Sequence, residues 1–172
     1  MNYNLHPIFV HFPIALFLLY SFLRIFPWPK RFPNVDWRLP RVVILVTGLL
    51  GAWLSSVTGE IANHIVRPSR SLLEMHEGFA GASVSVYVVL LIAELFIFFQ
   101  PTWLDNKYLS FLKSLNPVFL FLKKLFSQNW IMWLLSGAGA LLIAITGLLG
   151  GVMVYGTTAD PLAAPILNLL GL

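Results

Sequence analysis

The sequence contains no cysteine, and only 10% of its 172 residues carry charge. The missing cysteine excludes disulfides, thiolate-bound metals, iron–sulfur clusters and c-type haem attachment within this chain. Motifs for a nucleophilic triad, a phosphate-binding loop or a dinucleotide site are missing as well, so nothing supports hydrolase or kinase activity. Any redox or metal chemistry has to use histidine, carboxylate or a bound cofactor.

Hydrophobic residues make up 58% of the chain and the mean hydropathy is +0.82, which is typical of a membrane protein and not of a soluble domain. Crossing a bilayer takes about 20 apolar residues in a helix. Four runs are long enough, and prolines bound several of them: 7–27, 41–64, 74–100 and 130–155. The sequence predicts a single membrane domain over 1–172, an all-α antiparallel bundle of four transmembrane helices.

The eleven lysines and arginines lie mainly in two connections between these runs. Five lie in 24–41 and four in 101–129, whereas only Arg67 and Arg70 lie in 65–73. The positive-inside rule makes the two basic connections cytoplasmic and both termini periplasmic, in a bacterial inner membrane. This distribution is a topology signal, so the net charge of +4 does not indicate nucleic-acid binding. The N-terminus lacks the basic region of a signal peptide, so we expect the first helix to be retained.

Two further segments are too short or too polar to cross the bilayer. Residues 101–129 mix lysines with apolar side chains, which predicts either an amphipathic segment on the cytoplasmic surface or an ordinary linker broken by Pro117. Residues 161–167 are expected to touch the outer interface or a partner subunit.

All four histidines fall at the predicted outer end of the bundle: His6, His11, His64 and His76. Carboxylates accompany them, with Glu60 one turn before His64, Glu74 and Glu77 beside His76, and Asp160 after the last run. Ionisable groups in or near a membrane are costly and often functional, although those at the interface can simply be solvated.

Small residues recur at helical spacing in the last two runs. They favour close helix packing, or they make room for a flat macrocycle. The third run carries them on one face together with larger residues: His76, Ala80, Ser83, Tyr87 and Glu94. The fourth run carries Ser136, Gly139, Thr146 and Gly150, and Gly78, Gly81 and Gly151 lie nearby.

Neutral imidazoles on facing helices can bind haem iron axially. The first and third spans should be diagonal, so His11 with His76 is the first axial pair we predict, with His6 and His64 in reserve. An alternative is a non-haem iron, copper or zinc site that uses His64, Glu60 and Glu77. A third interpretation has the histidines only cap helix ends and bond interfacial groups.

The opening Leu5-His6-Pro7-Ile8-Phe9-Val10-His11-Phe12-Pro13-Ile14-Ala15-Leu16 resembles the HPxxVHFPIAL motif of a bacterial family of inner-membrane proteins, known only as a domain of unknown function. Thr58-Gly59-Glu60, His64 and His76 are also similar to that family's pattern. The resemblance is good over the first three spans and weak over the fourth. It implies an architecture similar to small b-type cytochrome bundles, and some members of the family resemble modules that are joined to c-type cytochrome domains, which favours electron transfer.

These observations predict a membrane-bound haem b protein that passes electrons between quinol and a periplasmic acceptor such as a c-type cytochrome, with Glu60 as a proton acceptor. An electron-transfer component is favoured over a stand-alone enzyme. The alternatives are the non-haem metal protein and a cofactor-free structural subunit that docks with other membrane subunits.

Overall fold

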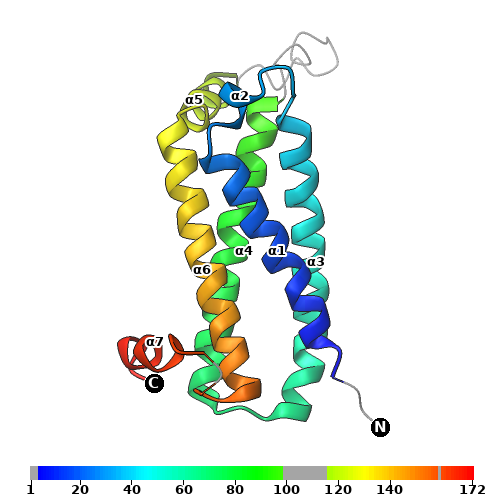
Figure 1. Cartoon of the computed structure of the whole chain (residues 1–172). Coiled ribbons are helices and arrows are strands. Elements are labelled where there is room, and N and C mark those ends of the chain that lie inside the picture. The colour runs from blue at the N-terminus through cyan, green and yellow to red at the C-terminus, as the bar shows by residue number, and fades with distance from the viewer. Residues whose placement is uncertain (1–3, 99–115, 159) are drawn as a thin grey trace.

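The chain folds into a bundle of four long helices, seen in a computed structural model that describes residues 4–98, 116–158 and 160–172 (Figure 1). The four long helices are α1 (His6–Ile25), α3 (Arg38–Val66), α4 (Arg70–Phe98) and α6 (Asn129–Tyr155). Each is long and apolar enough to cross a membrane. The predicted all-α membrane bundle is therefore confirmed, and the protein is a multi-pass membrane protein in contact with the lipid bilayer.

The helix boundaries follow the predicted runs with small differences. α1 ends at Ile25 because Pro27 cannot continue it. α4 begins at Arg70 and not at 74, since Arg70 and Glu74 form an ion pair of 2.7 Å one turn apart and so add a polar first turn. The predicted end of this span at residue 100 lies outside the described residues.

The helices are arranged so that α1 and α4 are diagonal. α1 packs against α3 and α6, and α4 packs against the same two helices. One end of the bundle carries the start of α1, the α3–α4 turn and the end of α6 (Figure 1). We name it the histidine end, for His6, His64 and His76. The opposite end, with α2 (Trp28–Arg31) and α5 (Asn116–Phe126), is named the arginine end, for Arg24 and Arg41.

Glycines permit the closest helix contacts. A Cβ built on Gly48 of α3 would lie 2.7 Å from the ring of Phe17 on α1. One on Gly139 of α6 would lie 3.0 Å from the ring of Tyr87 on α4. Small residues at such positions let helix backbones approach, which is how membrane helices pack without a hydrophobic driving force between them.

The core is aromatic, and the outer surface is apolar. Phe17 and Tyr87 stack across the diagonal with ring centroids 4.0 Å apart, and both are fully buried. Outside, Trp53, Leu134 and Leu141 each expose more than 60% of their surface. An apolar exterior of this kind matches lipid and not water.

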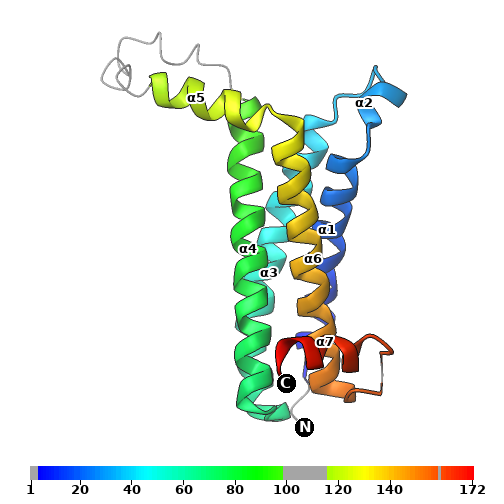
Figure 2. The same ribbon diagram turned by 90° about the vertical axis from the view of Figure 1, so that its left-hand side faces the viewer.

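Two short helices, α5 and α7, lie across the direction of the long helices (Figure 2). α5 buries no side chain and carries Lys123 and Lys124, as expected for a surface-lying segment; Pro117 begins this helix and does not break it. The first part of the predicted segment 101–129, residues 101–115, lies outside the described residues. α7 (Ala163–Leu170) packs on α6 at the histidine end, through Ala163 and Leu167 against Leu149 and Val152.

Candidate functional site

His6, at the start of α1, is held against α3. Its Nδ1 lies 3.2 Å from Oγ1 of Thr58. The Thr58 hydroxyl already has carbonyl acceptors at Leu54 and Ser55, each 3.1 Å away, so its oxygen accepts a hydrogen bond from the imidazole. A Cβ on Gly59 would come within 3.1 Å of the ring. Gly59 thus lets the imidazole lie close to the α3 backbone, and a side chain at this position would have to displace the ring.

His76, near the start of α4, is held against α6 in the same manner. Its Nδ1 donates a hydrogen bond of 3.1 Å to the backbone carbonyl of Thr146. A Cβ on Gly150 would lie 3.3 Å from this ring. Each of these two histidines therefore has one Nδ1 hydrogen bond and one glycine beside it, on a neighbouring helix.

The two hydrogen bonds determine the tautomers. Because Nδ1 of each ring donates, the lone pair lies on Nε2. The backbone of Ser55 is a further hydrogen-bond partner of His6. His6 and His76 come from diagonal helices, and both rings are partly buried at the histidine end. A histidine whose Nδ1–H is fixed and whose Nε2 is available has the arrangement of a metal-binding imidazole.

The other predicted ligands lie outside this pair. The side chain of His11 is exposed, and its Nδ1 contacts the carbonyl of Pro7 on the same helix. His64, Glu60 and Glu77 are also exposed. Within the ranges that the structure describes, no three His, Asp or Glu side chains gather closely enough to hold a metal ion. The structure thus holds His6 and His76 partly buried at the histidine end, whereas His11 is exposed.

The predicted glycines divide into two groups. Gly150 contacts His76, as described above, whereas Gly78 and Gly81 are exposed and a Cβ on either would meet no atom within 4 Å. These two glycines therefore leave no space inside the bundle for a macrocycle. The rotation of α4 that turns His76 inward turns both of them outward.

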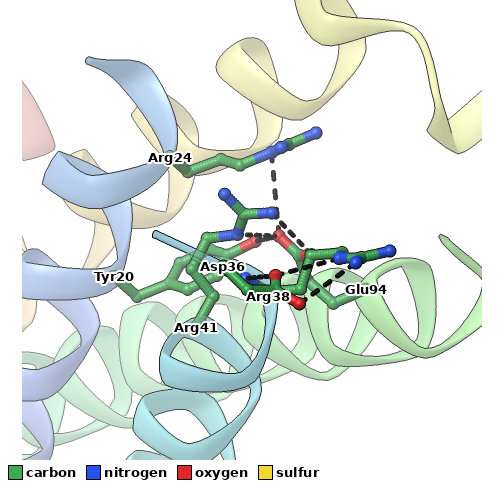
Figure 3. Close-up of polar contacts among 6 residues, drawn as sticks. All are labelled: Tyr20, Arg24, Asp36, Arg38, Arg41 and Glu94. Carbon is green, nitrogen blue, oxygen red and sulfur yellow. Dashed lines mark hydrogen bonds and ion pairs between the residues drawn. The ribbon is translucent and has the colours of Figure 1, made fainter. Parts of the chain in front are cut away.

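A second polar cluster lies at the arginine end, around Glu94 of α4 (Figure 3). Its carboxylate is 1% exposed and accepts a hydrogen bond of 3.0 Å from the hydroxyl of Tyr20. Nε of Arg41 lies 3.0 Å from the same carboxylate, and Nε of Arg24 lies 3.7 Å from it. The Arg24 and Arg41 side chains are themselves only 11% and 7% exposed. We name these four residues the Glu94 cluster.

Sequence reasoning missed the Glu94 cluster. It placed Arg24 and Arg41 in a cytoplasmic connection, whereas the structure has their side chains turned into the bundle. The sequence pattern places Glu94 on the same face of its run as His76 and Tyr87 but assigns it no partner, although an acid inside an apolar run normally faces the bundle interior and has one.

Between the two ends, a smaller polar network joins three helices. The hydroxyls of Ser21 and Tyr87 are 2.9 Å apart. Ser21 donates to the carbonyl of Ser136 at 2.9 Å, and Tyr87 donates to that of Phe17 at 3.1 Å. These bonds fix α1, α4 and α6 relative to one another, since buried polar groups in a membrane must find partners within the protein.

Outside the spans, the loop before α3 holds an exposed ion pair. Asp36 accepts from Nε of Arg38 at 3.0 Å and from its backbone N–H at 3.0 Å. The hydrogen bond from the Arg38 side chain, followed by that from its backbone, lowers the pKa of the Asp36 carboxyl.

Comparison of the chain with protein-family models, curated proteins and solved structures gives no match. The resemblance of the N-terminal motif to a family of inner-membrane proteins therefore stays a prediction.

Proposed function

We propose that this protein binds one b-type haem at the histidine end and transfers electrons, with His6 and His76 as the axial ligands. The observation that carries the proposal is that both imidazole rings are held in the same way, through a hydrogen bond at Nδ1. Each comes from one of two diagonal helices, and each has its Nδ1 fixed by a neighbouring helix, which leaves the lone pair on Nε2. Two imidazoles and no third ligand within the described residues suit haem better than a non-haem metal ion.

The roles of the surrounding residues follow from their contacts. Thr58 and the Thr146 carbonyl orient the rings and raise their basicity, while Gly59 and Gly150 let the rings lie flat against the helices. A bound haem supplies one-electron chemistry, and the apolar helix walls exclude water from the iron ligands.

We place the histidine end at the periplasmic face of a bacterial inner membrane. Nine of the eleven lysines and arginines belong to the connections at the other end: five in 24–41 and four in 101–129. Electrons then pass between quinol and an acceptor outside, such as a c-type cytochrome. Glu60, exposed near the same end of α3, is available to accept a proton released from quinol.

Haem titration into the purified chain tests the proposal. We expect the wild type to bind equimolar haem with a low-spin Soret band, and His6→Ala and His76→Ala each to abolish that spectrum. The controls His11→Ala and His64→Ala, whose side chains are exposed, should bind as the wild type does. Equal binding by all four variants, or loss only in the two controls, would contradict the proposed ligands.

A milder variant separates ligation from simple packing. Thr58→Val keeps the shape of the side chain but removes the acceptor for His6 Nδ1. Loss of such an outer partner costs about 10- to 100-fold in metal affinity, so haem affinity should fall by about that factor. If the wild type binds no haem, the two histidines are contacts that tie α1 to α3 and α4 to α6, and the protein is a structural subunit.

A further inference from the structure

A set of buried hydrogen-bond donors without acceptors lies at the arginine end, away from the proposed haem. The indole Nε1 atoms of Trp28 and Trp37 are buried and have no hydrogen-bond partner within the described part of the chain. The two indole rings contact each other, with centroids 5.9 Å apart, so both donors belong to one aromatic cluster. A buried N–H without an acceptor is costly and rare in folded proteins, which points to an acceptor from outside the chain.

The two tryptophans lie near the arginines of the Glu94 cluster in the sequence, Trp37 one helical turn before Arg41, and Trp28 at the start of α2 just after the end of α1. Trp28 follows Arg24 by four residues, and Trp37 precedes Arg41 by four, with the Arg41 N–H donating to the Trp37 carbonyl at 3.3 Å. The unpartnered indoles and the buried guanidinium groups therefore lie at the same end of the bundle, on the facing ends of α1 and α3 or the segment that joins them.

The charges of the Glu94 cluster do not balance. Among the residues that the structure describes, two guanidinium groups face one carboxylate, which leaves an excess of one positive charge on side chains that are 11% and 7% exposed. Nε of both arginines is buried and makes no hydrogen bond of good geometry, despite its closeness to Glu94. An uncompensated buried charge costs several kcal/mol, so a bound anion of single charge would remove a large penalty.

We propose that the arginine end binds a phosphate group through Arg24, Arg41, Trp28 and Trp37. A phosphodiester carries the single negative charge that the cluster lacks, and guanidinium groups match phosphate oxygens with paired donors. Tryptophan and arginine at the end of a membrane span lie at the level of lipid headgroups. The phosphate therefore comes from an anionic phospholipid or from free phosphate, and the proposal is independent of haem binding.

The test uses the full chain in neutral detergent, with phosphatidylglycerol, phosphatidylcholine and inorganic phosphate as separate probes. We expect phosphatidylglycerol to raise the thermal unfolding midpoint and to be retained in equimolar amount in native mass spectra. An equal shift by inorganic phosphate, with displacement of the lipid, would support the same site with free phosphate as its source. No shift and no retained ligand with either probe would overturn the proposal.

Variants connect the effect to these residues. Arg24→Gln and Trp37→Phe should each weaken phosphatidylglycerol retention about tenfold, since each removes a donor to an anion. Arg38→Gln is the matched control: it lies at the same end, but its side chain is 50% exposed and paired with Asp36. Trp28→Phe and Trp37→Phe preserve the aromatic packing, so they keep the test decisive should Arg24→Gln fail to fold. Equal weakening by Arg38→Gln, or unchanged retention in both Trp→Phe variants, would overturn the proposal.

Discussion

Replacing Glu94 by glutamine tests how strongly the bundle depends on the buried charges at its arginine end. Glutamine keeps the shape of the side chain and can still accept the hydrogen bond from Tyr20, which is 3.0 Å long. It leaves Arg24 and Arg41 buried without a countercharge. Breaking a buried ion pair from one side costs about 3–5 kcal/mol. For a chain of this size, each kcal/mol lowers the unfolding midpoint by about 2–4 °C, so we expect a fall of about 6–20 °C.

The same reasoning predicts an asymmetry between the two signs of charge. Arg41→Gln removes the nearer cation but leaves Glu94 paired with Arg24, whose Nε is 3.7 Å away. That variant keeps a balanced pair, so it should lose less stability than Glu94→Gln. Combining the two substitutions should recover part of the loss, because the charges interact directly.

Thermal unfolding in detergent, followed by circular dichroism, measures these differences. The control is Glu74→Gln, whose side chain is 62% exposed and paired with the exposed Arg70, and whose midpoint should stay close to that of the wild type. A change of less than about 2 °C for Glu94→Gln would refute the argument. So would an Arg41→Gln variant that is destabilised as much as Glu94→Gln.

Three further predictions concern packing, acid response and topology. Gly48→Ala should lower the free energy of unfolding by about 1–3 kcal/mol, because its Cβ would lie 2.7 Å from an aromatic ring. The control Gly137→Ala meets no atom within 4 Å, so its unfolding midpoint in the same thermal assay should stay close to that of the wild type. The Asp36 carboxyl should titrate by NMR below its ordinary 3.8, and its small stabilising effect should disappear as the pH falls through that lowered pKa. Because the chain has no native cysteine, Ser69→Cys should react with an impermeant thiol reagent from outside intact cells, and Ser127→Cys only after permeabilisation; the reverse pattern would contradict the orientation.

The bundle itself was predictable because its signals are strong and local. Long apolar runs specify spans, and prolines such as Pro27 stop helices whatever the tertiary context. Sequential antiparallel helices with short connections pack as neighbours, so the diagonal placement of α1 and α4 also followed.

The choice between His6 and His11 was not predictable, because it depends on how α1 is rotated. The two residues point about 140° apart on an ideal helix, so only one can face the interior. That rotation is set by contacts with α3: the ring of Phe17 packs on Gly48, and the imidazole of His6 hydrogen-bonds to Thr58. A single sequence shows small residues at these positions but not which partner occupies each.

The Glu94 cluster was hidden for a different reason. Arginine side chains near helix ends are long enough to turn either toward headgroups or into the bundle, and the positive-inside rule counts them equally in both cases. Only the positions of Tyr20 and Glu94 on the facing helices decide the direction.

The most direct test of the proposed haem site is a dithionite-reduced minus oxidised visible spectrum of the protein isolated from the membranes of haem-replete cells, measured beside His76→Ala. We predict a sharp α-band of low-spin haem in the wild type that is absent from the variant. A flat wild-type spectrum, or a band that survives in the His6→Ala and His76→Ala double variant, would contradict the account.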